Sequence, residues 1–477
     1  MIPKLRPMPI DPFNRHGWRL QQINYGEGPT ISEPVACQQA KSLVIGQQFV
    51  CTFGDQQHFA YIDFHGNFWD CFYDGGDTWS LLQINGGDLG APPAGNHAPF
   101  LCAFANQLHF IYLDQNLTLQ DCFVDGAPTG SPSPPQWQLR QINGPNPPTV
   151  SEALVCPRAP QVGAASLQAS QWPGFAVHPL GDQLHFTYVD AQFNVQDCYY
   201  DDSNPTLPWP LQQINNSEGL GPTVTGPPPE SVACTEATAG ASCLFVCTFG
   251  NQQHCAYVDG ANNLWDVYND GDATQWNVQK INGGGVSTPQ PAPSLIEGGT
   301  VFVCTFGNTL HFTYIDSANN LQDCFYDSDV DQWFLQQING GQPTVQGESV
   351  RFPDAPPVST VVNAWFVCGF GDQLHFIYVD ENYNLQDCWY GFMPNGNGLP
   401  GGVNVWDVVQ ITGDGGVFAD APAFGDTGTL FVCAYGSQLH ITYTDNQYNL
   451  QDVYWVSLPG EIGLTGGHVQ RITLPQG

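Results

Sequence analysis

The chain has 477 residues, of which 10 are Lys or Arg and 44 are Asp or Glu, and its formal net charge at pH 7 is −34. Nucleic acids and anionic membranes bind basic surfaces, so this charge argues against both as partners. No run of 18 or more apolar residues occurs, and we therefore expect no membrane insertion. The 52 Gly and 39 Pro residues, with short runs of strand-forming residues, favour an all-β protein with many turns.

Residues 1–17 are predicted to form an irregular tail. They include basic residues but lack the apolar stretch of a secretion signal. The localisation therefore stays open between a protein that is not exported by that route and one whose signal has been removed. Two glycosylation motifs, at Asn116 and Asn215, would be used only in a secreted protein.

A Trp-led phrase, WRLQQIN at residues 18–24, is the first predicted strand, and related phrases recur along the chain. We call each of them a D strand. The later copies start at Trp79, Trp137, Trp209, Trp276, Trp333, Trp406 and, without the Trp, at His468. Each unit also contains an apolar run such as FVCTFG at Phe302, which we call the A strand, followed by a hairpin.

The hairpin is the clearest repeat. In LHFTYIDSANNLQDCFYD, starting at Leu310, two alternating runs flank a polar turn and are predicted to form antiparallel B and C strands. Further copies start at Gln57, Leu108, Leu184, Gln253, Leu374 and Leu439. Seven units of four short strands predict a seven-bladed β-propeller, with a linear β-solenoid as the alternative.

The propeller is expected to be one domain over residues 18–477. Its blades are predicted at about 36–87, 98–145, 172–217, 243–284, 294–341, 356–413 and 422–475. A closed ring needs seven D strands, but the sequence holds eight such phrases. We expect residues 18–24 to close the ring as the outer strand of the last blade, with the copy at His468 beside it or displaced.

Most of the 16 Cys residues follow the repeat, on either the A or the C strand. In three units Val177, Val267 or Val453 replaces one member of the set. Exchange with Val indicates small buried apolar residues, so we expect most of these thiols to be reduced. The disulfide state stays open for the Cys residues outside the pattern, which are Cys37, Cys156, Cys234, Cys243 and Cys255.

In every unit a His on the B strand is followed 12 residues later by an Asp on the C strand. With the turn centred between them, the two side chains are expected to stand opposite each other on one face. Either the Asp braces a buried imidazole, or the pair lines a pocket between blades and holds hydroxyl groups of a ligand. The pairs are His58/Asp70, His109/Asp121, His185/Asp197, His254/Asp266, His311/Asp323, His375/Asp387 and His440/Asp452.

A two-residue turn at Gly54 and Asp55 would place Cys51 opposite His58, which suggests a Cys–His–Asp triad. We set this interpretation aside because the row occurs six times, and we expect no catalytic residue in it. A zinc site is not expected either, because each blade lacks a fourth ligand and the CxxC and HxxxH spacings are absent. The sequence indicates no cofactor.

The order of the A, B, C and D phrases resembles the fungal fucose-lectin family and related bacterial seven-bladed lectins. In that family a B-strand Arg and a C-strand Glu hydrogen-bond a sugar between blades, and an aromatic residue of the next blade stacks on it. The matching positions are His311 and Asp323 and their equivalents, so the resemblance implies that all seven pairs bind carbohydrate. Because His lacks the fork of Arg and Asp is shorter than Glu, this implication does not extend to fucose.

Aromatic residues are available for stacking, although the D-strand Trp residues also suit a packed core. The other candidates are Trp69, Trp265, Tyr73, Tyr326 and Trp389.

These observations favour a multivalent carbohydrate-binding protein whose weak sites gain strength by avidity, with glycans or other small polar ligands as partners. The alternative is an enzyme of small-molecule metabolism, of cyclase or pericyclase type, with one active site in the axial channel or a divergent cleft. Irregular units favour the enzyme, namely His178 and Pro179, Cys255, and an insertion at 391–402. A protein-interaction scaffold is a third class, and the oligomeric state stays open.

Overall fold

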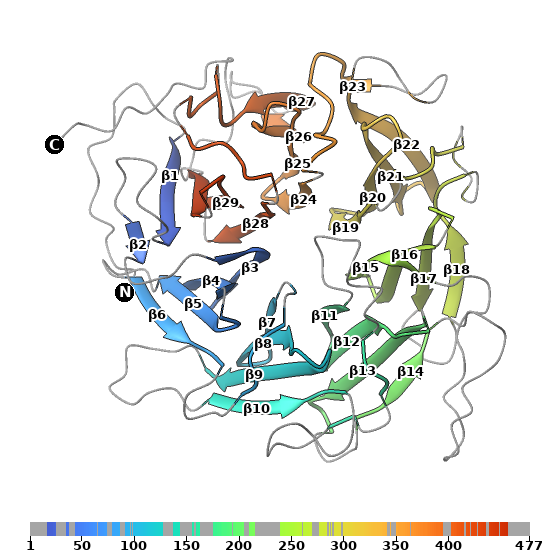
Figure 1. Cartoon of the computed structure of the whole chain (residues 1–477). Coiled ribbons are helices and arrows are strands. Elements are labelled where there is room, and N and C mark those ends of the chain that lie inside the picture. Colours follow the sequence, from blue (N-terminus) through green and yellow to red (C-terminus); the bar gives the residue numbers. More distant parts are fainter. Residues whose placement is uncertain are drawn as a thin grey trace.

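The alternating runs of the repeat form seven antiparallel sheets that radiate from a central axis (Figure 1). The computed structural model describes residues 17–24, 35–37 and, with gaps, 43–456; the longest gaps are 127–136, 144–154, 163–174 and 215–238. The predicted seven-bladed β-propeller is therefore confirmed, and the described residues contain no helix. No helix long and apolar enough to cross a membrane occurs in this part of the chain.

Each blade has its four strands in the order A, B, C and D. Blades one to three contain β3 (Leu43–Phe53), β4 (Gln56–Asp63), β5 (Phe68–Tyr73) and β6 (Trp79–Gln83); β7 (Phe100–Phe104), β8 (Gln107–Leu113), β9 (Leu119–Asp125) and β10 (Trp137–Gln141); and β11 (Phe175–Leu180), β12 (Gln183–Val189), β13 (Val195–Asp201) and β14 (Leu211–Gln213).

The next three blades repeat the same order. Blades four to six contain β15 (Ala239–Phe249), β16 (Gln252–Asp259), β17 (Leu264–Asn269) and β18 (Trp276–Lys280); β19 (Val301–Phe306), β20 (Thr309–Ile315), β21 (Leu321–Asp327) and β22 (Gln332–Asn339); and β24 (Trp365–Phe370), β25 (Gln373–Val379), β26 (Leu385–Pro394) and β27 (Gly402–Gln410).

Blade seven joins the two ends of the described chain. It contains β28 (Leu430–Tyr435), β29 (Gln438–Thr444) and β30 (Leu450–Val456), and its D strand is β1 (Gly17–Asn24). Trp18 of β1 pairs with Trp455 of β30 in an antiparallel register, so the predicted closure of the ring is confirmed. The phrase at His468 lies outside the described residues.

Two blades carry a fifth strand that the sequence does not predict. β2 (Val35–Cys37) pairs in parallel with β1, and β23 (Val350–Phe352) pairs in parallel with β22. These short strands extend the outer edges of blades seven and five, away from the axis (Figure 1).

The A strands surround the axis and each contacts the A strands of its two neighbours, which closes the ring. Between blades, the apolar side chains of one sheet pack on those of the next. Ala256 and Leu264 of blade four, for example, share a buried cluster with Val303 and Phe312 of blade five. Burial on both faces explains why apolar residues occupy both parities of the B strand.

The turn between the B and C strands is organised by an Asp whose role was not predicted. In blade five, Asp316 Oδ1 accepts the backbone N–H groups of Ala318 and Asn320, and Oδ2 accepts Nε2 of Gln322. In blades one and four the equivalent Asp accepts an indole N–H instead. These Asp–Trp pairs, which therefore brace turns, are Asp63 with Trp69 and Asp259 with Trp265.

Candidate functional site

The predicted His–Asp pairs form in all seven blades. The distance from His Nδ1 to the nearer Asp oxygen is 2.8 Å in three pairs and 2.9–3.0 Å in the other four. The three shorter pairs are those of His58, His185 and His440, and the four longer ones are those of His109, His254, His311 and His375.

The register of the pairs differs from the prediction. His311 lies directly opposite Phe325, while Asp323 lies opposite Thr313. The two partners are therefore diagonal neighbours on one face of the hairpin, within hydrogen-bond reach but not opposite each other.

Both members of each pair are buried, which departs from the expectation of ligand-binding groups in an open pocket. A ligand in a cleft between blades can reach at most an edge of the imidazole and meets almost none of the carboxylate. This burial favours the bracing role, and direct sugar contact by the 14 residues stays a prediction. Asp70, Asp387 and Asp452 are each 1% exposed, and Asp121, Asp197, Asp266 and Asp323 are 0% exposed.

A third group, on the D strand, completes the brace in several blades. Nε2 of Gln212, Gln279 or Gln336 donates to the paired Asp, and Arg140 Nε donates to Asp121 at 2.7 Å. Burial alone would raise the pKa of Asp121, but the charges and hydrogen bonds of His109 and Arg140 outweigh it and lower that pKa.

Two further braces differ at this third position. Leu82 pairs with Asp70 and Val409 pairs with Asp387, so neither D strand offers a side-chain donor. Asp70 Oδ1 is buried without a hydrogen-bond partner, whereas both oxygens of Asp387 accept from His375 Nδ1. In blade seven the paired D-strand residue is Gln21, whose side chain lies outside the described residues, and Thr442 Oγ1 of the B strand donates to Asp452 Oδ1. Direct ligand contact by Asp70, Asp387 and Asp452 stays a prediction.

The A-strand thiols lie beside these pairs, as predicted, with Cys51 opposite His58. Burial, followed by the charge of the paired Asp, raises the pKa of these thiols, to about 12 at Cys433. A thiol is nucleophilic only as the thiolate, so the row is not an activated Cys–His–Asp triad. Among the described residues, no group of three or more His, Cys, Asp or Glu side chains is arranged to hold a metal ion.

Most of the described Cys residues carry thiols, as predicted for the repeat. Cys71 is an exception, because it is disulfide-bonded. Cys234 and the side chains of Cys37 and Cys243 lie outside the described part of the chain, as does Asn215. The Cys residues that form no disulfide are Cys51, Cys102, Cys122, Cys156, Cys198, Cys247, Cys255, Cys304, Cys324, Cys368, Cys388 and Cys433.

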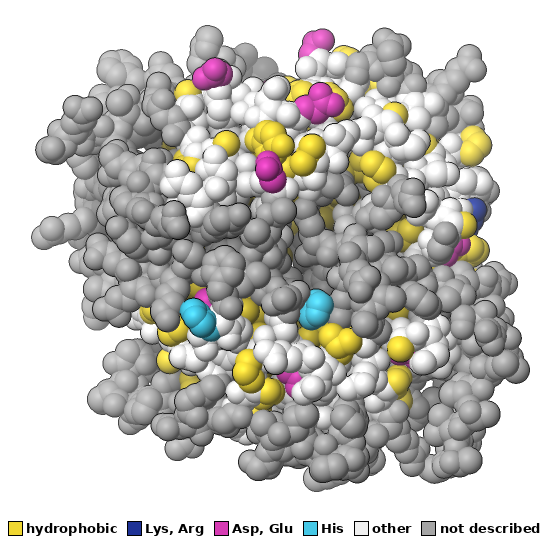
Figure 2. Space-filling model, viewed as in Figure 1, with side chains coloured by type: hydrophobic (Ala, Val, Ile, Leu, Met, Phe, Trp, Pro, Cys, Tyr) yellow, Lys and Arg dark blue, Asp and Glu magenta, His cyan; other side chains and the backbone are white. Residues whose placement is uncertain are grey.

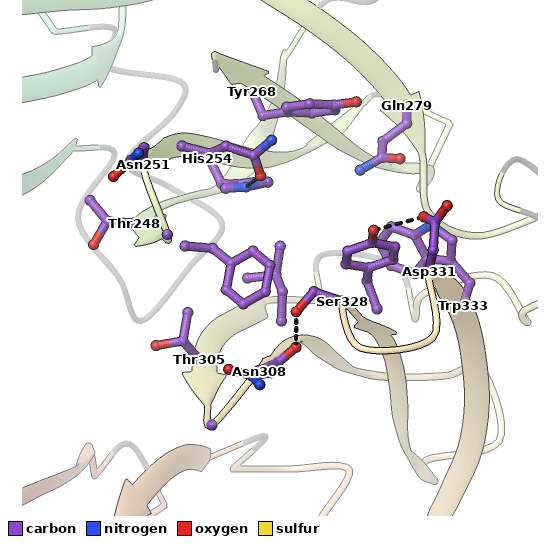
Figure 3. A pocket seen from close by; sticks show the side chains of 16 residues that line it. Thr248, Asn251, His254, Tyr268, Gln279, Thr305, Asn308, Ser328, Asp331 and Trp333 are labelled. Atoms are coloured by element: carbon purple, nitrogen blue, oxygen red, sulfur yellow. Dashed lines mark hydrogen bonds between the residues drawn. The ribbon is translucent and has the colours of Figure 1, made fainter. Parts of the chain in front are cut away.

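A cavity of about 830 Å³ lies between blades four and five, and we call it the 4/5 cleft. Its volume falls in the range of small-molecule sites, about 300–1,000 Å³. The blades contribute different side chains to its walls (Figure 3). Blade four supplies Phe249, His254, Tyr268 and Gln279, and blade five supplies Tyr326, Ser328, Asp331 and Trp333.

The aromatic walls of the 4/5 cleft are held in place by their neighbours. The Tyr268 ring stacks on His254, with centroids 5.2 Å apart and planes at 17°. The Tyr326 ring contacts Trp333 at 5.5 Å, and its hydroxyl donates to Asp331 Oδ1 at 2.8 Å. The brace of His254 therefore supports one wall, and the turn that carries Asp331 supports the other.

Two polar groups of the 4/5 cleft have acceptor oxygens that no described residue uses. Gln279 Nε2 donates to Asp266, which turns the amide oxygen away from that carboxylate. This oxygen has no hydrogen-bond partner among the described residues, and Gln279 is only half-buried. Asp331 is exposed, and only its Oδ1 accepts a described hydrogen bond.

Several other clefts differ from this one. The D-strand position of Gln279 is Leu82 in blade one and Val409 in blade six, so these blades lack the polar group. In the cleft between blades two and three, the Arg140 guanidinium fills the corresponding space. Between blades six and seven, the Trp455 ring lies 6.3 Å from that of His375.

The predicted stacking residues separate into two groups. Trp389 is 3% exposed and belongs to the packed interior, whereas Tyr326 lines the 4/5 cleft and Tyr73 is half-buried in blade one. The described D-strand Trp side chains are half-buried and pack on core clusters, and Trp333 also borders the cavity. The side chain of Trp79 lies outside the described residues.

Two residues of the 4/5 cleft, Gln279 and Asp331, were not predicted from the sequence. The only available signal was the fourth residue of the WxLQQIN phrase, which varies between units while its neighbours recur. It is Gln279 in blade four and Arg140 in blade two.

The irregular units also have structural explanations. His178 stacks on His185 at 5.0 Å and lies 3.2 Å from Gln253 Nε2 of the next blade. Cys255 is fully buried between blades three and four. The insertion at 391–402 extends β26 and β27, and residues 395–401 lie outside the described part of the chain.

No family model and no curated protein sequence matches the chain. Solved structures do match. The BP39L lectin from Burkholderia pseudomallei shares 16% identity over 87% of this chain and 99% of its own, with a TM-score of 0.52. The chain resembles a lectin β-propeller. This likeness shows the fold, and the predicted resemblance is confirmed at that level.

Fungal lectins are also among the matches. The Aleuria aurantia lectin, described as a six-bladed propeller with a novel mode of fucose recognition, has 13% identity, a TM-score of 0.37, and coverage of 79% of this chain and 95% of its own. AofleA from Arthrobotrys oligospora has 9% identity, a TM-score of 0.40, and coverage of 83% and 92%.

Proposed function

We propose that this lectin-like propeller binds carbohydrate, and that the 4/5 cleft is a binding site. A sugar presents C–H groups on its faces and hydroxyl groups on its edge, so it needs an aromatic wall and directional polar partners. The observation that carries the proposal is the pairing of Tyr268 and Tyr326, on neighbouring blades, with the amide oxygen of Gln279 and the carboxylate of Asp331 in one cavity.

The proposal gives the predicted His and Asp different roles in this cleft. His254 borders the cavity and presents a ring edge to the ligand, whereas Asp266 is fully buried and orients His254 and Gln279. In the other six blades we propose that the pair acts as a brace that positions the cleft wall. Because the clefts differ, we expect fewer than seven ligands to bind per chain.

The sugar-binding site can be tested with an aromatic residue from each of two clefts. A glycan array identifies a ligand, and titration calorimetry measures its affinity for the wild type and for Tyr326→Ala. We expect about a tenfold loss of affinity, because an aromatic contact contributes about 0.5–1.5 kcal/mol beyond its buried area. Tyr200→Ala removes the equivalent ring of the Arg140-filled cleft and serves as the matched control, with affinity unchanged.

The same measurements can refute the carbohydrate function and the 4/5 site separately. An array on which no glycan binds would refute the carbohydrate function, and equal affinity in wild type and Tyr326→Ala would refute the 4/5 site. The enzyme alternative is favoured by one observation, the inequality of the clefts, and predicts turnover of a small molecule that is lost on substitution at a single cleft.

A further inference from the structure

Within the described residues, two clefts contain a cationic side chain of the chain itself. The Arg140 guanidinium lies between blades two and three, with its central carbon 4.2 Å from the centroid of the Phe123 ring, 4.9 Å from that of Trp209 and 5.5 Å from that of Tyr200. Its Nε donates to Asp121 at 2.7 Å, and its side chain is 12% exposed. This cleft is thus an aromatic box closed around a positive charge.

Between blades five and six a cation comes from another position, Arg351 of β23, which is more exposed than Arg140 and contacts one aromatic ring. The Arg351 guanidinium lies 5.3 Å from the centroid of the Trp406 ring, and its Nε donates to Gln336 Oε1 at 2.7 Å. Gln336 in turn donates Nε2 to Asp323. A D-strand Gln bound to the paired Asp therefore presents its oxygen to a cation on the cleft side.

The 4/5 cleft has the same walls without a cation of its own. Gln279 stands at the position of Arg140, and its oxygen is oriented like that of Gln336 but has no described partner. The space that the guanidinium fills in one cleft is an open cavity here. Tyr268, Tyr326 and Trp333 occupy the repeat positions of Phe123, Tyr200 and Trp209, and Phe249 meets Tyr326 as Phe104 meets Tyr200.

Charge in and around the 4/5 cleft favours a positive ligand. Among the described residues that line it, Asp331 is the only Asp, Glu, Lys or Arg. The chain as a whole carries −34, and Figure 2 shows acidic side chains scattered over the described part of one face, with few basic ones. Such a field draws cations toward the cleft and repels anions.

We propose that the 4/5 cleft binds a small organic cation, an ammonium or guanidinium group, over the rings of Tyr268, Tyr326 and Trp333. The Gln279 oxygen and the Asp331 carboxylate accept its N–H hydrogen bonds. The inference deepens the proposed carbohydrate function and rests on it for the choice of ligand among sugars. A hexosamine with a free amino group supplies the ring hydroxyls, the apolar face and the cation in one molecule.

The test compares charged and neutral ligands of similar shape by titration calorimetry on the full chain. The probes are glucosamine, its neutral counterparts glucose and N-acetylglucosamine, and methylguanidinium as a cation without a sugar. We expect glucosamine to bind about tenfold more tightly than either neutral sugar, because a cation over aromatic rings adds attraction that a neutral group lacks. We also expect added salt to weaken glucosamine binding, since screening weakens charge attraction.

Gln279→Arg is expected to fill the cavity with a guanidinium group, as Arg140 does between blades two and three. It reproduces the residue of blade two, so it is expected to fold and to abolish binding of glucosamine and methylguanidinium. Val361→Arg adds the same charge at a position that is 64% exposed and outside the cavity lining, and it should leave binding unchanged. Arg140→Gln, which restores the residue found in blade four, should open the cleft between blades two and three and add a second site.

The outcomes separate the two proposals. Equal affinities for glucosamine, glucose and N-acetylglucosamine would overturn the cation inference and leave the carbohydrate function standing. Binding of methylguanidinium with no bound sugar would support the cation site and overturn the carbohydrate function. Cation binding that survives Gln279→Arg would overturn the assignment to the 4/5 cleft.

Discussion

Asp266→Ala is expected to destabilise the protein by breaking the brace beneath the 4/5 cleft. Asp266 is fully buried and accepts hydrogen bonds from His254 Nδ1 and Gln279 Nε2, both at 2.9 Å. The substitution leaves His254, which is 3% exposed, without its acceptor, while the half-buried Gln279 can turn toward water. A buried donor without a partner costs about 1–3 kcal/mol, and breaking a buried pair costs about 3–5 kcal/mol.

We therefore expect Asp266→Ala to lower the free energy of unfolding by about 3 kcal/mol. Urea unfolding followed by Trp fluorescence measures it, from the midpoint at unchanged slope. The double variant His254→Phe with Asp266→Val removes both polar partners and keeps a ring against Tyr268, so it should recover more than half of the loss. A loss below about 0.5 kcal/mol in the single variant would refute the bracing role.

Three further predictions concern pH, thiols and ring closure. Burial, followed by the charge of His185, lowers the pKa of His178 to about 3, whereas the pKa in the unfolded chain is about 6.5. The contribution of this group to stability is therefore fully present above pH 6.5 and is lost as the pH falls from 6.5 toward 3. Unfolding free energy should fall by about 2 kcal/mol between pH 7 and pH 5 from this group, and His178→Cys should remove that part of the pH dependence; an unchanged profile would contradict the assignment. Mass spectrometry of denatured, unreduced protein should find Cys51, Cys304 and Cys368 alkylated and Cys71 protected, and the reverse pattern would contradict it. Deletion of residues 1–24 removes the strand paired with β30, so the variant should melt at a lower temperature, and an unchanged melting temperature would show that β1 does not close the ring.

The propeller and its closure could be predicted because the signals are local and repeated. Alternation in the Leu310 hairpin predicts its strands, and a surplus D phrase at Trp18 predicts the closure that the pairing with Trp455 confirms. The parallel strands β2 and β23 could not be predicted, because three-residue pairings carry no periodic pattern.

The site was harder to predict than the fold, because a repeat pattern identifies the residues that its copies share and not those at which they differ. The His–Asp pairs are shared and prove to be buried, whereas the clefts differ at one D-strand position, which is Gln279 in one blade and Arg140 in another. Whether that position faces a packed interface or a cavity depends on the neighbouring blade, and no single unit of sequence contains both walls. Asp331 likewise reaches the cavity only through the shape of its turn, where its φ is 54°.

The proposed carbohydrate function requires that a sugar bind in the 4/5 cleft. The most direct measurement is a crystal structure of the protein with the ligand that the glycan array identifies. We expect density for a sugar ring between Tyr268 and Tyr326, with polar contacts to Gln279 and Asp331. A ligand bound only in the axial channel, or only in clefts between other blades, would contradict it.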